Sequence, residues 1–208
     1  MSMFITVEGG EGGGKSTNLA FIEKYLIEQG KDVVVTREPG GTELGEKLRQ
    51  ILLDPGNEGM NERAELLLMF AARAQHISQV IKPALDAGKT VLCDRFTDAT
   101  YAYQGGGRCL PVEDIAILEN WVQGDLRPDL TILLDLDIEI GLHRAGQRGD
   151  KDRFEQEEKK FFQRVRQCYL QMANDQPERY RVIDASKPLD AVQSQIQQML
   201  DDVIPVLS

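Results

Sequence analysis

The sequence has no surplus of positive charge. Its 208 residues include 24 lysines and arginines against 34 aspartates and glutamates, which gives a formal net charge of −10. A protein that coats nucleic acid displaces counterions with a cationic surplus, so the composition argues against that class. A small phosphorylated ligand is not excluded, because a few well-placed cations are enough to bind it.

Cysteine, histidine and long apolar runs are also scarce. The cysteines and histidines lie far apart and form no C-x-x-C pair: Cys93, Cys109, Cys168, His76 and His143. This spacing predicts neither a disulfide framework nor a zinc centre. The longest wholly apolar run, residues 66–72, is far too short to span a membrane. The first residues carry no positive charge ahead of an apolar stretch, unlike a secretory signal. We therefore expect a reduced, cytoplasmic protein without a membrane or nucleic-acid partner.

Short apolar runs alternate with longer amphipathic segments along the chain. Strands are expected at residues 4–7, 33–36, 90–93, 130–134 and 181–183. Helices are expected at residues 15–29, 43–53, 62–87 and 111–123, then before the last strand and from about residue 189. Apolar strands separated by helices are typical of a doubly wound five-stranded parallel sheet, with helices on both faces. We predict one α/β domain over residues 1–208, with ligands beyond the carboxyl ends of the strands.

A glycine-rich loop follows the first expected strand. Residues 9–16 read GGEGGGKS and match the phosphate-binding pattern G-x-x-x-x-G-K-[ST], a match that chance gives in roughly one such chain in two hundred. Glycines let successive backbone N–H groups turn toward phosphate oxygens, and the helix that follows aims its positive end at the same anion. Lys15 would bridge the β- and γ-phosphates of ATP, and the Ser16 hydroxyl would bind Mg²⁺. A merely flexible turn is the weaker interpretation. The GTPase motifs D-x-x-G and N-K-x-D are absent, whereas a regulatory ATPase stays possible.

Arginines follow several of the expected strands. Arg37 and Arg95 come after the second and third strands, and Arg144, Arg148 and Arg153 come after the fourth. Each alone could be a solvated surface charge, but together they indicate a second anionic ligand facing the first. A phosphate acceptor is already a nucleophile, so the protein has only to align two anions and exclude water. The pattern predicts phosphorylation of a nucleoside monophosphate.

Several motifs together resemble those of bacterial thymidylate kinases, P-loop nucleoside monophosphate kinases. Besides the glycine-rich loop they are REPGGT at 37–42, FAARAQ at 70–75, DRF at 94–96, AYQGGGR at 102–108, PDLT at 128–131 and DRFE at 152–155. The resemblance covers nearly the whole chain. It implies Mg²⁺-dependent transfer of a phosphoryl group from ATP to dTMP, giving dTDP for DNA precursor synthesis.

The resemblance also implies roles for individual residues. ATP phosphates would lie on Gly10, Glu11, Gly12, Gly13, Gly14, Lys15, Ser16 and Thr17, with Mg²⁺ held by Ser16 and Asp94, mostly through water. The dTMP phosphate would meet Arg37, Arg49 and Arg95, with Glu11 and Glu38 nearby. Thymine would meet Arg73, Gln104 and Thr100, and Tyr103 would crowd the 2′ position and disfavour ribonucleotides.

A lid over about residues 144–156 is the second implication of the resemblance. The loop carries Glu11 and no arginine, so a lid arginine would reach the transferring phosphoryl group: Arg153 first, Arg148 second. The catalytic set is then Lys15, Arg95, Arg153, Arg148, Glu11 and Asp94. The family forms homodimers through helices that flank the sheet, and residues 62–87 are a candidate for that surface.

Two points stay open at this level. Met69 stands where many family members have an aromatic residue four positions before the helix arginine, and Phe70 stands three positions before it, so either could face thymine. Trp121, Phe161, Phe162 and Tyr169 are expected to pack rather than bind. The competing functions are a kinase for another nucleotide, an ATPase that switches a partner protein, and an inactive nucleotide-binding protein.

Overall fold

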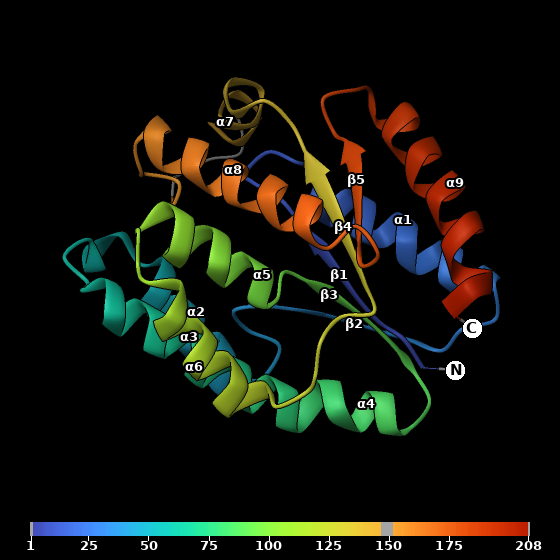
Figure 1. The fold of residues 1–208 in the computed structure, drawn as a ribbon, viewed down its shortest axis with the longest axis horizontal. Coiled ribbons are helices and arrows are strands. Elements are labelled where there is room, and N and C mark those ends of the chain that lie inside the picture. Colours follow the sequence, from blue (N-terminus) through green and yellow to red (C-terminus); the bar gives the residue numbers. More distant parts are fainter. Residues whose placement is uncertain (1, 147–151, 208) are drawn as a thin grey trace.

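The computed structural model describes residues 2–146 and 152–207. Its sheet has five parallel strands: β1 (Phe4–Glu8), β2 (Val33–Arg37), β3 (Thr90–Asp94), β4 (Leu130–Asp135) and β5 (Tyr180–Asp184). They lie in the order β2-β3-β1-β4-β5 (Figure 1). The central strands β1 and β4 are buried along nearly their whole length, whereas the edge strand β2 is partly exposed. The predicted doubly wound parallel sheet is confirmed.

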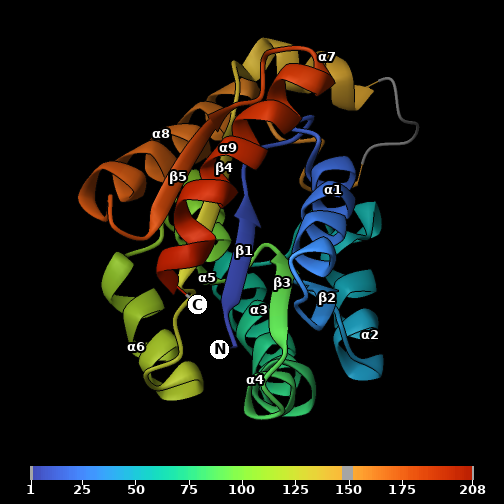
Figure 2. The ribbon, with the colours of Figure 1, turned by 90° about the vertical axis from the view of Figure 1, so that its right-hand side faces the viewer.

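Helices cover both faces of this sheet (Figure 2). In chain order they are α1 (Lys15–Glu28), α2 (Glu43–Leu53), η1 (Pro55–Asn57), α3 (Glu62–His76), η2 (Ile77–Ile81), α4 (Lys82–Asp86), α5 (Thr97–Thr100), η3 (Tyr101–Gly107), α6 (Val112–Gln123), α7 (Ile138–Gly146), α8 (Lys159–Asp175) and α9 (Leu189–Leu207). Helices α1 and α9 pack on one face, with Ile22 and Leu26 meeting Val192 and Ile196. On the other face, α8 packs against β4, and η2 and α4 pack against β1 and β3.

Two helical segments differ from the sequence-based expectation. The helix predicted over residues 62–87 is continuous, but it widens to π geometry at η2, between α3 and α4. Residues 97–107, for which no helix was expected, form α5 and η3 directly after β3. The three glycines at 105–107 have poor helix propensity, and packing against α8 overrides it: a Cβ on Gly107 would lie 2.4 Å from the Phe161 ring.

The aromatic residues expected to pack divide into two groups. Phe161, Phe162 and Tyr169 of α8 are buried, as predicted. Trp121 is 82% exposed, so the expectation that it packs within the chain is wrong. Helical spacing puts an apolar residue on one face of α6, but does not decide whether the same chain covers that face. Within the described residues, no helix combines the length and apolarity needed to cross a bilayer.

Candidate active site

A cavity of about 250 Å³ opens at the carboxyl edge of the sheet, where the predicted ligands were expected. The predicted site residues that line it are Glu11, Gly12, Gly13, Gly14, Lys15, Ser16, Glu38, Arg49, Met69, Arg73, Asp94, Arg95, Thr100, Tyr103 and Gln104. Most of the site residues proposed from sequence are therefore brought together. Those outside the lining are Gly10, Thr17, Arg37, Phe70 and Arg153, while Arg148 lies outside the described residues.

The glycine-rich loop leads into the first turn of α1 without a side-chain cap. Gly12 and Gly14 have φ values of +71° and +77°, and a Cβ on Gly12 would lie 2.1 Å from the Gly141 carbonyl oxygen. Because Gly14 supplies no capping side chain, the first N–H groups of α1 remain available to an anion. Gly10 borders a separate small hollow beside the loop, and Thr17 is exposed on the first turn of α1.

Lys15 folds back over the loop. Its Nζ donates to the carbonyl oxygens of Gly9 at 3.0 Å and Gly10 at 2.8 Å. Burial, and then the charge of Arg95, lower the pKa of Lys15 to about 8. The negative charges of Glu11, Asp94 and Glu8 offset only part of this lowering, so a phosphate at the loop would stabilise the ammonium further.

Arg95 is the second cation at the loop. Its Nη2 donates to Glu11 Oε1 at 2.7 Å and to the Tyr103 hydroxyl at 3.2 Å, while that hydroxyl donates to Glu11 Oε1 at 2.8 Å. Burial alone would lower the pKa of Arg95, but Tyr103, Glu11 and Asp94 together raise it well above its usual value. Arg95 is therefore a permanent positive charge, held in one orientation between the loop and η3.

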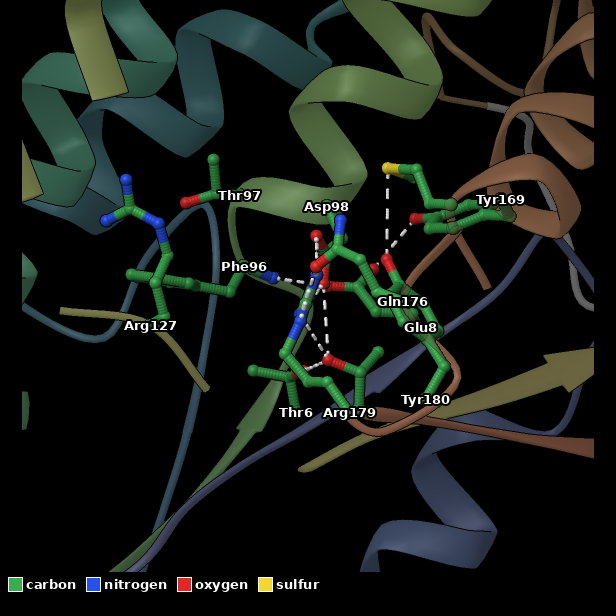
Figure 3. Close-up of polar contacts among 12 residues, drawn as sticks. Thr6, Glu8, Phe96, Thr97, Asp98, Arg127, Tyr169, Gln176, Arg179 and Tyr180 are labelled. Carbon is green, nitrogen blue, oxygen red and sulfur yellow. Dashed lines mark hydrogen bonds and ion pairs between the residues drawn. The ribbon is translucent and has the colours of Figure 1, made fainter. Parts of the chain in front are cut away.

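The backbone at Arg95 is unusual, because its φ of +64° lies in the left-handed region. The neighbouring Phe96 N–H donates to Glu8 Oε1 at 2.7 Å, and the Arg95 N–H donates to the Val7 carbonyl oxygen at 3.1 Å. Glu8 is fully buried, and its second oxygen accepts from the Tyr169 hydroxyl at 2.7 Å (Figure 3). Burial, and then the negative charge of Asp98, raise the pKa of Glu8 to about 8.

A second buried carboxylate lies beside Glu8 in Figure 3. Asp98 pairs with Arg179 at 2.6 Å and accepts from the Thr131 hydroxyl at 3.2 Å. The contacts of Glu8 and Asp98 hold the segment that follows β3 in place. Because Arg95 belongs to this segment, the same contacts stabilise its position. Sequence reasoning missed both residues. For Glu8 the available signal was an acidic residue at the end of a mostly apolar strand, directly before the glycine-rich loop.

Arg73, from α3, also lines the cavity. Its Nε donates to Glu38 Oε2 at 2.7 Å and its Nη2 donates to the Thr100 hydroxyl at 3.0 Å. Its Nη1 is buried and has no hydrogen-bond partner among the described residues. A buried donor without a partner is costly, so this nitrogen is suited to receive an acceptor on a ligand.

Met69 and Phe70 occupy different places. Met69 lines the cavity, whereas Phe70 packs with Leu66 and Ile115 between α3 and α6. The Phe70 ring also lies 4.8 Å from the guanidinium carbon of Arg73. Of the two candidates left open by the sequence, Met69 is the one that faces the cavity, and Phe70 supports Arg73 from behind.

Gln104 and Arg153 meet on a carboxylate that sequence reasoning missed. Glu65 is fully buried, and it accepts from Gln104 Nε2 at 2.8 Å and from the guanidinium groups of Arg108 and Arg153. Arg153 Nε also donates to the Leu52 carbonyl oxygen at 2.8 Å. The guanidinium of Arg153 is thus held by Glu65 and Leu52, and Arg153 does not line the cavity. The physical reason is Glu65, because a buried carboxylate requires cationic partners.

The three arginines predicted to bind the second phosphate are close enough to influence one another. Burial, and then the charges of Arg37 and Arg95, lower the pKa of Arg49. Arg49 Nη1 donates to the Pro39 carbonyl oxygen at 2.9 Å, whereas Arg37 pairs with Glu46 at 2.8 Å outside the lining. Like charges gathered in this way indicate an anion site between Arg49 and Arg95.

Comparisons with known proteins agree with this geometry. Residues 7–196 match the family model described as thymidylate kinase. The chain is 62% identical to the thymidylate kinase of Pseudomonas entomophila strain L48 over 202 residues, which is 97% of this chain and 96% of that protein. It is 61% identical, over 97% of this chain and 98% of the relative, to the thymidylate kinase of Pseudomonas putida strain W619. The crystal structure of thymidylate kinase from Ehrlichia chaffeensis is similar with a TM-score of 0.79 and 34% identity, covering 96% of this chain and 98% of that chain.

Proposed function

The chain belongs to the thymidylate kinase family, and from this premise we propose how its cavity transfers the γ-phosphoryl group of ATP to dTMP, giving ADP and dTDP. The observation that carries the proposal is the continuity of the cavity, which runs from the glycine-rich loop to Arg73 and Gln104. A switch ATPase needs only the first of these two ends. A phosphotransferase needs both, because its two substrates must meet in line.

The donor end would hold the phosphates of ATP. Residues Gly10 to Thr17 supply backbone N–H groups and the positive end of α1, and Lys15 supplies an ammonium whose pKa is lowered by burial. When phosphate oxygens replace the carbonyl oxygens of Gly9 and Gly10 as its partners, Lys15 gains a charged acceptor. That exchange would favour the protonated lysine and hold the transferring group against the loop.

Ser16 and Asp94 are suited to hold Mg²⁺, mostly through water. Both line the cavity, and Asp94 Oδ1 is buried without a hydrogen-bond partner among the described residues. This oxygen lies 3.8 Å from Arg95 Nη1 in an ion pair, and a buried carboxylate oxygen without a hydrogen bond suits a hydrated divalent cation, which prefers oxygen ligands. When bound, Mg²⁺ would neutralise charge on the phosphate oxygens.

The acceptor phosphate would lie between Arg49 and Arg95. Arg95 is already fixed by Glu11 and Tyr103, so no orientation has to be gained when the phosphate arrives. Arg37 pairs with Glu46 outside the cavity lining. Unless that ion pair opens, Arg37 would attract the acceptor phosphate only through its positive charge. Tyr103 lines the same part of the cavity, where it would crowd a 2′-hydroxyl.

The base would lie between Met69, Thr100, Arg73 and Gln104. Thymine offers carbonyl oxygens, which accept, and one ring N–H, which donates. The unpartnered Arg73 Nη1 would meet a carbonyl oxygen. Because Gln104 Nε2 is used by Glu65, its amide oxygen is available to the ring N–H. The side chain of Phe70 would act only by supporting Arg73.

The lid over about residues 144–156 would close the cavity. Asp152, Phe154 and Glu155 already line it. We assign Arg153 to anchoring this segment, since its guanidinium is held by Glu65 and Leu52. Arg148 is then the candidate for the arginine that meets the transferring phosphoryl group.

A homodimer is supported by apolar side chains on the outside of α3 and α6, two helices that pack against each other. The exposed side chains are Leu67, Val112, Ile117 and Trp121. A large exposed apolar patch of this kind is typical of a protein–protein interface. Residues 1–208 would form one catalytic domain of a cytoplasmic enzyme.

Steady-state ADP formation with Mg²⁺ and ATP tests the function when dTMP, dUMP, dCMP, dGMP and dAMP are offered separately. We expect ADP formation that depends on dTMP, with dTDP as the second product. Strong ADP formation without any acceptor would favour the switch ATPase. Preference for another nucleotide would keep the mechanism and overturn the roles given to Arg73 and Gln104.

A further inference from the structure

His76 is a buried histidine that touches the cavity only through other residues. It is the last residue of α3 and is fully buried. Its Nδ1 lies 2.9 Å from Glu38 Oε1, and its Nε2 lies 2.6 Å from the Thr36 hydroxyl. A carboxylate can only accept, so Nδ1 carries the proton in this pair. The imidazole ring therefore joins β2 to the carboxylate of Glu38.

Glu38 connects His76 to Arg73. One oxygen of Glu38 faces His76, and the other accepts from Arg73 Nε at 2.7 Å. Because the two oxygens are rigidly connected, the bond to His76 fixes the plane of the carboxylate, and that plane fixes the direction of the Arg73 guanidinium. Both side chains are almost fully buried, so water cannot replace a lost partner at low cost.

Arg73 and Glu38 line the cavity, whereas His76 does not. With Nε on Glu38 and Nη2 on Thr100, the remaining Nη1 is buried without a hydrogen-bond partner among the described residues, in a side chain that lines the cavity. We propose that His76 is a positioning residue that aims Arg73 at the base of the acceptor nucleotide by orienting Glu38. The proposal rests on the function given above and adds a residue that does not touch either substrate.

The packing at Gly41 is independent evidence that the imidazole ring of His76 has a defined position. Gly41 has a φ of +76°, and a Cβ there would lie 2.6 Å from His76 Cδ2 and Nε2 and 2.7 Å from the Thr36 hydroxyl oxygen. The second glycine of the REPGGT motif thus leaves room for the ring against β2. This packing explains the glycine at position 41 without any contact to a nucleotide.

Two substitutions of His76 test the roles of its two ring nitrogens separately. His76→Asn can place an amide N–H where Nδ1 lies, and His76→Gln can place one where Nε2 lies. Loss of a buried hydrogen bond to a charged group predicts a rise of about tenfold in KM for dTMP in His76→Ala and His76→Gln. KM for ATP should stay within about twofold, since Arg73 donates to Glu38 and Thr100 rather than to the glycine-rich loop, and kcat should change less than KM for dTMP. His76→Asn should restore KM for dTMP to near the wild-type value.

Thymidine binding isolates the base contact, because thymidine lacks the phosphate that Arg95 would hold. We expect His76→Gln to weaken the binding of thymidine and of dTMP by the same factor in calorimetric titrations. Ile77→Ala is the matched control: Ile77 is the next residue along the chain, is equally enclosed, and packs against β1 and β3. It should lower the melting temperature without changing KM for dTMP.

Two results would overturn the role of His76. One is that His76→Asn and His76→Gln have the same KM for dTMP. The other is a lowered melting temperature with KM for dTMP unchanged, the result expected for Ile77→Ala, which would assign His76 to folding alone. Absence of dTMP-dependent ADP formation in the wild-type protein would instead overturn the function, so the two failures are distinguishable.

Discussion

Arg153 and Glu65 form an ion pair behind the cavity, although 88 positions separate them in the sequence. Neither side chain is more than 4% exposed. The pair ties the segment that follows residue 151 to α3, and Arg108 and Gln104 bind the same carboxylate. The place of Asp152, Phe154 and Glu155 in the cavity lining and the orientation of Gln104 therefore depend on one buried acidic residue.

Substitution of Arg153 should affect stability more than chemistry. Removing one partner of a buried ion pair leaves an uncompensated charge, so Arg153→Ala should lower the free energy of unfolding by about 3 kcal/mol or more. Arg148→Ala should leave stability unchanged and lower kcat by about a thousandfold, as removal of an arginine that contacts the transferring group does. Urea unfolding and initial rates on both variants test this. A thousandfold lower kcat in folded Arg153→Ala, with Arg148→Ala near normal, would return the catalytic role to Arg153.

ATP binding should weaken as pH rises through about 8. The pKa of Lys15 in the free protein is lowered to about 8 by burial and by Arg95, so the ammonium is lost above that pH while the phosphates stay charged. Calorimetric titration of ATP between pH 7 and pH 9 measures this effect. Lys15→Met removes the titrating group, and its weaker binding should no longer change over that range. An unchanged pH dependence in Lys15→Met would assign the titration to another group.

The stability contribution of Glu8 should fall as pH rises. Its pKa in the folded protein is about 8, above its ordinary value of 4.5, so folding takes up a proton between these values. The contribution is therefore fully present below about pH 4.5 and is lost as pH rises through about 8. Glu8→Gln keeps an acceptor for the Phe96 N–H and does not titrate. Thermal unfolding from pH 5 to pH 9 should show a smaller decline for Glu8→Gln; parallel curves would show that Glu8 ionises normally.

Trp121 should report dimer formation directly, since it is the single tryptophan in the chain. We expect its fluorescence to shift to longer wavelength on dilution, as the ring moves from an interface into water. Trp121→Glu should sediment as a monomer, because it places a charge on the apolar face of α6. Lys24→Glu, at an exposed position on α1 remote from α3 and α6, is the control and should sediment as a dimer. If the wild type and Trp121→Glu both sediment as monomers, this surface is not a dimer interface.

The sequence predicted the sheet because its central strands are continuously apolar and its loop motif has a strict spacing. It also named most of the residues that line the cavity, since parallel strands bring their carboxyl ends to one edge. Glu65, His76 and Glu8 were missed because their importance comes from burial, and burial depends on contacts between residues far apart in the sequence. For Arg153 the motif gives a residue type and a position, but not the direction of its guanidinium, which Glu65 and Leu52 hold.

The position of Met69 relative to Phe70 shows the same limit. Both neighbour Arg73 on the surface of α3, and helical spacing alone does not separate them. The choice depends on how α3 is rotated against α6, where Phe70 meets Ile115. Trp121 was expected to pack but is exposed, because helical periodicity alone does not show whether the chain itself covers an apolar face.

Transfer of label from γ-³²P-ATP tests the central claim most directly. If the cavity aligns ATP with dTMP, all label released from ATP should appear in dTDP, in equal amount to the ADP formed, and none should appear as inorganic phosphate at early times. Label that appears as inorganic phosphate, with dTMP recovered unchanged, would contradict the account and show that the second end of the cavity does not hold an acceptor.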